Sequence, residues 1–364
     1  MPLNCGIVGL PNVGKSTLFN AITNTSNAQA ANYPFCTIEP NSGIVPVGDE
    51  RLEKLAKIAG SEKIIPNTIE IIDIAGLVKG ASKGEGLGNQ FLGNIRQVDA
   101  ILHVVRCFED DDIIHVDGNV DPLRDIEVIE TELLLADIAV LEKRADNLQK
   151  KMKTQKDAGL ELEIAKKLIN AMNNGTMASN VSLSNDEIQI AKTFQLITQK
   201  PVIYIINTDE KGLKNTNKYA QSVMEFAKKR NINTVTICAK VEAELSEFEG
   251  EDKKTMLAEL GLTSSGLEKI ARSAFDILDL ITFFTIGPKE AHAWSIKRGG
   301  SAPNAAGVIH TDFEKGFIKA EVISYNDYVT LGGEAGAKQA GKFRLEGKEY
   351  LICDGDIVHF KFNV

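Results

Sequence analysis

The sequence has few cysteines, no long apolar run and no excess of positive charge. Its five cysteines, among 364 residues, are odd in number and form no Cys-x-x-Cys pair. They therefore imply neither a disulfide framework nor a zinc site. The apolar runs are too short to span a bilayer, and the first residues do not show the basic, apolar and small-residue order of a secretion signal. We expect a protein of the reducing cytoplasm with no membrane partner.

The charge balance argues against a protein that coats nucleic acid. Lysine and arginine total 41 against 50 aspartates and glutamates, a formal net charge of −9. This balance argues against wholesale coating of nucleic acid and gives no reason to expect a DNA partner, although a local basic patch is compatible with it. With 43% hydrophobic and 25% charged residues, the chain has an ordinary globular composition and room for two or three domains.

A phosphate-binding motif is the strongest feature of the sequence. Residues 9–17 read GLPNVGKST, between an apolar run at 5–8 that predicts a buried strand and a helix start at Thr17. The glycines let backbone N–H groups converge on a β-phosphate, and Lys15 adds charge between the β- and γ-phosphates. The Ser16 hydroxyl suits Mg²⁺, and the helix N-terminus favours an anion. We expect nucleotide contacts from Asn12, Val13, Gly14, Lys15, Ser16 and Thr17.

Two further segments resemble the γ-phosphate sensors of switch GTPases. Thr37 ends the polar loop NYPFCT at 32–37, and a loop threonine is the usual second protein ligand of Mg²⁺. Residues 68–73 predict a strand that ends in Asp-x-x-Gly, where Asp73 holds Mg²⁺ through water and the Gly76 N–H reaches the γ-phosphate. We therefore expect Ser16, Thr37 and Asp73 at the metal, and Lys15 and Gly76 in catalysis.

Leu77 stands where Ras-like enzymes place a glutamine that orients the attacking water. Leucine cannot hydrogen-bond water, so we expect slow intrinsic turnover and a substitute group. Asn12 could hold a K⁺ beside the phosphates, or simply shape the loop. His115, in the polar segment 110–118, could swing in to orient water, or be an ordinary surface residue. His103 is less suitable, because residues 100–105 predict a buried strand.

The base-reading motif favours adenine. A predicted strand ending at Asn207 runs into NTDE, where GTPases carry Asn-Lys-x-Asp. The aspartate of that motif accepts two hydrogen bonds that only guanine offers, and the longer Glu210 displaces the carboxylate by about one C–C bond. Thr208 removes the long lysine side chain that packs along the base. Residues 233–240 predict one more strand, which resembles the Ser-Ala-Lys motif whose backbone closes over the base. We expect Asn207, Thr208 and Glu210 at the nucleoside.

Together these motifs resemble the Obg-like ATPase family, in its YchF branch. The matching segments span the chain and include DIAGLVKGA at 73–81, AAGVIHTDFEKGF at 305–317 and DGD at 354–356. The resemblance implies an Mg²⁺-dependent ATPase that uses GTP less well, binds ribosomes, chiefly the large subunit and its RNA, and regulates translation. It also implies a P-loop NTPase fold with a helical coiled-coil insertion and a C-terminal β-grasp domain of the TGS type.

The region between the last two motifs predicts a helical arm. Residues 128–156 contain no proline or glycine, and leucines recur every seven residues at 134, 141 and 148, with Ile138, Ala145 and Met152 between them. Residues 160–172 and 186–198 predict returning helices. Lysine and arginine predominate in the distal part, at positions 143, 144, 150, 151, 153, 156, 166 and 167. Such a face is either simply solvated or contacts ribosomal RNA.

From about Ile281 the sequence alternates as short half-buried strands. We divide the chain into a G domain at 1–280 and a TGS domain at 281–364. Within the G domain, residues 1–128 and 201–280 form the nucleotide core and 129–200 the insertion. His310 and His359 have no cluster of metal-binding neighbours in the sequence, so we expect structural or surface roles. A GTP-driven switch, and a nucleotide-gated ribosome-binding adaptor with incidental hydrolysis, are the alternative functions.

Overall fold

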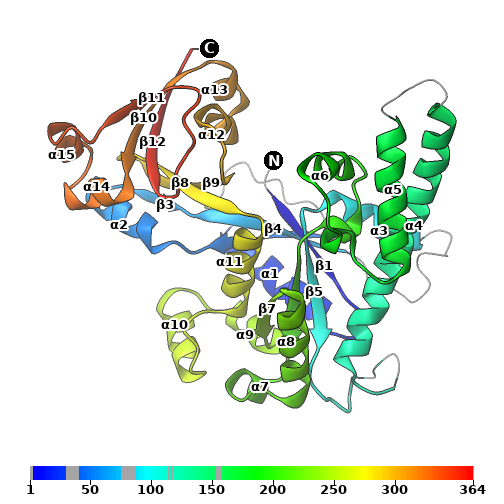
Figure 1. The fold of residues 1–364 in the computed structure, drawn as a ribbon. Coiled ribbons are helices and arrows are strands. Elements are labelled where there is room, and N and C mark those ends of the chain that lie inside the picture. Colours follow the sequence, from blue (N-terminus) through cyan, green and yellow to red (C-terminus); the bar gives the residue numbers. More distant parts are fainter. Residues whose placement is uncertain are drawn as a thin grey trace.

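Two β-sheets and a helical arm make up the protein (Figure 1). The structure is a computed structural model that describes residues 3–29, 41–74, 87–113, 115, 118–152 and 158–363. For 27–29 and 87–90 it describes the backbone alone. The arm and the second sheet project from the first sheet in different directions, so three separately packed parts are visible (Figure 1).

The first sheet holds the phosphate-binding motif. Its strand order is β2-β4-β1-β5-β6-β7, and every neighbouring pair is parallel except β2 with β4. The strands are β1 (Asn4–Val8), β2 (Ser42–Val47), β4 (Asn67–Asp73), β5 (Ala100–Arg106), β6 (Val202–Asn207) and β7 (Asn233–Ile237). The β5 sequence AILHVVR is buried at every position, as a central parallel strand covered on both faces requires. The strands expected at 5–8 and 68–73 are thereby confirmed, while the strand expected at 233–240 ends at Ile237, because α9 begins at Ala239.

Helices cover both faces of this sheet. One face carries α1, α9 and α11, which pack on β2 and β7 and on one another, while α4 and α8 cover β5 and β6 from the other face. The helix expected from Thr17 begins two residues earlier, at Lys15, so the motif lysine belongs to the first helical turn. The helices around the sheet are α1 (Lys15–Gln29), α3 (Leu87–Gln97), α7 (Glu210–Lys214), α8 (Lys218–Arg230), α9 (Ala239–Leu245), α10 (Gly250–Glu259) and α11 (Gly266–Ile277).

The arm begins earlier than its heptads predict. Its long helix α4 spans Pro122–Lys151, because Asp121 caps the N-terminus by accepting from the Arg124 N–H and Pro122 fits the first turn. Leu134, Leu141 and Leu148 are buried as predicted, but Met152 is 49% exposed, so its expected place in the seam is wrong. The rest of the arm is α5 (Ala158–Asn173), the 3₁₀ turns η2 (Ala178–Asn180) and η3 (Ile197–Gln199), and α6 (Asn185–Lys192).

The last helix of the arm is shorter than expected. The sequence predicts a helix to residue 198, but α6 ends at Lys192 and Gln195 has a φ of +53°. The chain then returns to the middle of α4, where buried Asp137 accepts from the backbone N–H groups of Ile197 (3.1 Å) and Thr198 (2.8 Å). Arg96 of α3 approaches the same carboxylate at 3.3 Å. The buried Asp137 carboxylate thus connects the arm to α3, one of the helices around the first sheet.

The second sheet contains the C-terminal strands and one short strand from the N-terminal part of the chain, in the order β11-β10-β12-β8-β9-β3. They are β3 (Lys63–Ile65), β8 (Leu280–Ile286), β9 (Glu290–Lys297), β10 (Phe317–Ser324), β11 (Arg344–Glu346) and β12 (Asp356–Phe362). The short helices of this part are α12 (Ala302–Ile309), α13 (Thr311–Lys315), α14 (Tyr325–Thr330) and α15 (Glu334–Gln339). Central β12 is parallel to β8, and the mixed sheet carries α12 over a core of its own, which confirms the β-grasp fold class.

An N-terminal segment completes this second sheet. The three-residue strand β3 pairs in parallel with β9, and α2 (Glu50–Ala59) buries Leu52 and Leu55 in a cluster with Phe284 and Ile323. Residues 50–65 therefore pack with the C-terminal strands, although the sequence division at 280 assigns them to the G domain. The domain boundaries remain our proposal.

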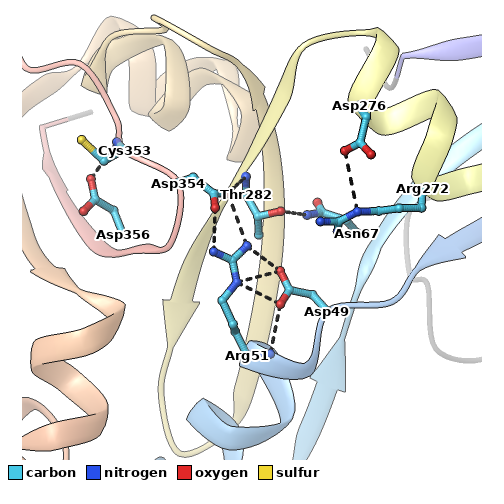
Figure 2. Close-up of polar contacts among 9 residues, drawn as sticks. All are labelled: Asp49, Arg51, Asn67, Arg272, Asp276, Thr282, Cys353, Asp354 and Asp356. Atoms are coloured by element: carbon cyan, nitrogen blue, oxygen red, sulfur yellow. Dashed lines mark hydrogen bonds and ion pairs between the residues drawn. The ribbon is translucent and has the colours of Figure 1, made fainter. Parts of the chain in front are cut away.

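A polar network joins the two sheets (Figure 2). Arg51 of α2 pairs with the cap residue Asp49 at 2.8 Å and with Asp354 at 2.7 Å. Asp354 also accepts from the Thr282 N–H (2.9 Å), and Asn67 of β4 donates to the Thr282 hydroxyl (3.0 Å). The Asp354 carboxyl keeps its pKa below the usual range through its bonds to Arg51 and Thr282, which outweigh the opposing effect of burial. The DGD segment is therefore part of the joint between the sheets.

Candidate nucleotide-binding site

The phosphate loop bends where its residues allow it. Between β1 and α1, Asn12 has a φ of +61° and Gly14 a φ of +97°, the left-handed region that Gly and Asn tolerate best. A Cβ on Gly14 would lie 2.2 Å from the Asn207 amide nitrogen, so only glycine fits here. The loop is thus shaped by its own sequence and by the base-side motif across the cavity.

Lys15 is folded against its own loop. Its Nζ donates to the carbonyl oxygens of Gly9 (2.8 Å) and Leu10 (2.6 Å), and the residue is 8% exposed. Burial lowers the pKa of Lys15 to about 8, although nearby Asp73 acts in the opposite direction. A triphosphate would supply the anion that this ammonium group lacks.

Asp73 ends β4 beside the phosphate loop. Its Oδ1 is buried and has no hydrogen-bond partner among the described residues. Burial raises the pKa of this carboxyl, and Lys15 opposes the rise. A buried carboxylate oxygen of this kind fits a divalent cation. Ser16, which is exposed to the cavity, offers a second oxygen. Thr37, the third expected ligand, lies outside the described residues.

Asn207 of the base-side motif forms hydrogen bonds both to the phosphate loop and to the turn after β7. The Asn207 side-chain amide donates to the Val13 carbonyl (2.9 Å), and its oxygen accepts from the Ala239 N–H (2.9 Å). Asn207 thus connects the phosphate loop to the turn after β7. Asp209 caps α7 by accepting from the Gly212 N–H (2.8 Å), and Glu210 begins that helix.

A cavity of about 660 Å³ is lined by residues of the phosphate loop and of the base-side motif, whereas Asp73 is not among its lining residues. Of the expected contacts it is lined by Asn12, Gly14, Lys15, Ser16, Thr17, Asn207, Thr208 and Glu210. Val13 is buried beneath the loop and contributes through its carbonyl. The sequence reasoning missed Phe108, Asp110 and Ile113, which line the cavity from the loop after β5. The signal that points to them is their position after a buried parallel strand, where ligand-binding loops gather.

The remaining expected residues lie elsewhere. Gly76 is outside the described residues. His115 does not line the cavity: it is 6% exposed, and its Nε2 lies 2.9 Å from Asp125 Oδ2 of α4. It is therefore no ordinary surface residue. His103 is buried in β5, and burial, with Lys15 nearby, lowers its pKa to about 3, so its imidazole is neutral.

The described residues show no cluster of side chains that could hold a metal ion by themselves. In the ranges set out above, no three His, Cys, Asp or Glu side chains come close enough to hold a metal ion. His310 caps α13 by accepting from the Asp312 N–H, and His359 is exposed on β12, as expected of structural and surface residues. No described helix is both long and apolar enough for a membrane span.

The strand order β4-β1-β5-β6 brings a phosphate loop, a carboxylate and a base motif to the carboxyl edge of one sheet. This arrangement is that of the P-loop nucleoside triphosphatases, and the chain is an enzyme of this class.

Comparison with known proteins narrows the class. Residues 4–135 match a family model described as "50S ribosome-binding GTPase", and residues 280–363 match the YchF-GTPase C-terminal model, described as "Protein of unknown function (DUF933)". The chain is 53% identical to the "Ribosome-binding ATPase YchF" of Haemophilus influenzae and 51% identical to that of Bacillus subtilis, each over all of both chains.

A solved structure agrees with these relatives. "Structure of the Schizosaccharomyces pombe YchF GTPase" is 39% identical, with a TM-score of 0.89 over 99% of this chain and 97% of that one. The chain therefore belongs to the YchF family, which confirms the resemblance drawn from its motifs.

Proposed function

We propose that this enzyme hydrolyses ATP in preference to GTP. The observation that carries the proposal is the pair Thr208 and Glu210 at the nucleoside end of the cavity. Guanine recognition uses a lysine side chain that packs along the base and an aspartate carboxylate that accepts two hydrogen bonds. Thr208 is too short to pack in this way, and the carboxylate of Glu210 lies one carbon farther from the backbone. Asp209 cannot easily take over, because its Oδ1 is bound to the Gly212 N–H. The names given to the relatives differ on this point: the Haemophilus influenzae protein is called an ATPase, and the Schizosaccharomyces pombe protein is called a GTPase.

Competition for the purified protein tests this preference. ATP should displace a fluorescent nucleotide at lower concentration than GTP does. Thr208→Lys with Glu210→Asp should move the preference toward GTP, whereas Glu225→Asp, an exposed position on α8, should leave it unchanged. Equal or tighter GTP binding by the unaltered protein would contradict the proposal and favour a GTP-driven switch.

We further propose the catalytic arrangement. Ser16, Thr37 and Asp73 would hold Mg²⁺, which supplies positive charge to the β- and γ-phosphate oxygens. Lys15 would leave the loop carbonyls for the phosphates, and the Gly76 N–H would bind the γ-phosphate. Either His115 would orient the attacking water, or Asn12 would hold a K⁺, whose positive charge would favour the transition state.

Finally, we propose that the enzyme works in the cytoplasm and regulates translation by binding the large ribosomal subunit. The relatives named as ribosome-binding support this, as do exposed lysines on the arm such as Lys150 and Lys166. Part of the predicted basic face is used internally: Arg144 donates to the Thr193 carbonyl and stacks on Phe194, and Lys167 pairs with Glu187. Ribosome binding by a variant that cannot hydrolyse ATP would favour the adaptor alternative.

A further inference from the structure

The loop after β5 has a special position at the cavity. Strand β5 lies between β1, which leads into the phosphate loop, and β6, which leads into the base motif. The loop at 107–113 therefore leaves the sheet between the two ends of the bound nucleotide. Three of its residues, Phe108, Asp110 and Ile113, line the cavity. What holds this loop in place therefore shapes the site.

Arg106, the last residue of β5, holds the loop from beneath. It is 2% exposed, and its guanidinium donates to three carbonyl oxygens: Phe108 (Nε, 3.2 Å), Ile113 (Nη1, 3.0 Å) and Asp110 (Nη2, 3.4 Å). It also stacks 4.7 Å from the centre of the Phe108 ring. The residues whose carbonyls it binds are the same three that line the cavity. One buried side chain thus determines the path of the whole loop.

The start of the loop is attached to the base side of the site. The Cys107 N–H donates to the Asn207 carbonyl at 2.8 Å. The Asn217 amide donates to the Cys107 carbonyl (2.7 Å) and to the Thr208 hydroxyl (3.0 Å). The loop is therefore coupled to the residues that face the base, and none of these bonds involves the phosphate loop.

We propose that Arg106 is a positioning residue for the nucleoside half of the substrate, which rests on the proposed ATP-binding function. Charged donors to carbonyls make strong, directional bonds, and here they order the loop before the nucleotide arrives. Binding then does not have to order Phe108 and its neighbours, so affinity is higher. Because the phosphates are held by the separate loop at 9–17, Arg106 affects recognition of the nucleoside and not of the triphosphate.

The test compares two ligands of the same protein. Calorimetry with Mg²⁺ would measure the dissociation constants of ATP and of inorganic tripolyphosphate, which has no nucleoside. The side chain of methionine is similar in length to that of arginine but has no hydrogen-bond donors. Arg106→Met should raise the dissociation constant of ATP about tenfold or more and change that of tripolyphosphate by no more than about twofold. Arg106→Lys, which retains a charged donor, should recover part of the loss. Arg230→Met is the matched control, since Arg230 also stacks on a phenylalanine, at 4.0 Å, but outside the cavity.

A second variant guards against misfolding. Asn217→Asp keeps the oxygen that caps α8 by accepting from the Ala220 N–H, but it removes the amide that donates to the Cys107 carbonyl. This variant should also bind ATP more weakly while binding tripolyphosphate as before. Equal losses for both ligands in folded Arg106 variants, or no loss for ATP, would overturn the proposal. Failure of the unaltered protein to bind ATP would instead refute the proposed function.

Discussion

Gly14 and Asn207 meet across the nucleotide cavity with no room for a side chain between them. A Cβ on Gly14 would lie 2.2 Å from Asn207 Nδ2, the atom that donates to the Val13 carbonyl. The glycine of the phosphate loop thus serves two purposes, since it also has a φ of +97°. Gly14 of the phosphate loop and Asn207 of the base-side motif therefore form one structural unit.

The first prediction follows from this contact. Gly14→Ala should weaken ATP binding about 30- to 1,000-fold, because backbone strain costs about 1–3 kcal/mol and the displaced Asn207 bond about 1 kcal/mol. Calorimetry would measure the loss, and circular dichroism would show an unchanged fold. Gly93→Ala is the control, because a Cβ there meets nothing within 4 Å inside α3. It should leave affinity unchanged and stabilise the protein by about 0.5–1 kcal/mol.

The second prediction concerns pH. With a pKa of about 8 in the free protein, Lys15 loses its proton as the pH rises above that value, and a triphosphate must restore it. ATP affinity should therefore change little around pH 7, where Lys15 is mostly protonated, and weaken by up to tenfold per pH unit above 8. Titrations in two buffers of different ionisation enthalpy would count the proton taken up. Lys15→Arg, which stays charged, should lose this dependence; a flat profile to pH 9.5 in the unaltered protein would count against the idea.

The third prediction tests the monovalent ion. If Asn12 holds K⁺ beside the phosphates, turnover should be several-fold faster in K⁺ than in Na⁺, and Asn12→Ala should abolish the difference. Because Asn12 has a φ of +61°, alanine adds strain there. Asn12→Gly removes the amide without that strain and is the cleaner variant. Identical rates in the two salts would eliminate the ion.

The fourth prediction tests His115. If its imidazole orients water, His115→Ala should slow hydrolysis about 100-fold or more while leaving the ATP dissociation constant unchanged. To act, the ring must leave Asp125, 2.9 Å away in the structure. His359→Ala, on the exposed face of β12, is the control. Full activity of His115→Ala would exclude the imidazole as the substitute for the missing glutamine.

The fifth prediction concerns the arm. Lys150 and Lys151 are exposed near the end of α4. Reversing both to glutamate should weaken co-sedimentation with ribosomal subunits and flatten its salt dependence by roughly one logarithmic unit of slope per lost phosphate contact. Hydrolysis without ribosomes should hardly change. The matched pair Lys228→Glu and Lys229→Glu on α8 should bind normally; unaltered binding of the arm variant would mean that its face is merely solvated.

The local parts of this molecule could be predicted from sequence. The phosphate loop, the strand ending at Asp73 and the base motif after β6 depend on short patterns of burial and turn residues, and all lie where the sequence places them. Even the early start of α4 has a local signal, because Asp121-Pro122 is a helix cap followed by a first-turn proline.

The rest depends on contacts between distant residues. Arg106 is the last residue of a buried strand, and no pattern of sequence spacing predicts that its guanidinium donates to three loop carbonyls. Strand β3 has only three residues, too few for an alternating pattern, and its partner β9 lies in the C-terminal part of the chain. His115 lies in a segment with several aspartates, 110–118, which leaves both a catalytic and a surface role open, and only the fold shows that it is buried with its Nε2 2.9 Å from Asp125.

The place of β3 in the second sheet has a consequence for the synthesis of the chain. Residues 50–65 emerge from the ribosome long before β8 and β9, the strands on which they pack. Until β8 and the strands after it have been made, Leu52 and Leu55 have no C-terminal core to cover them, so the apolar face of residues 50–59 has no partner while the arm is synthesised. A fragment that begins at residue 281 would lack this helix and its edge strand, and would leave Phe284 uncovered in turn.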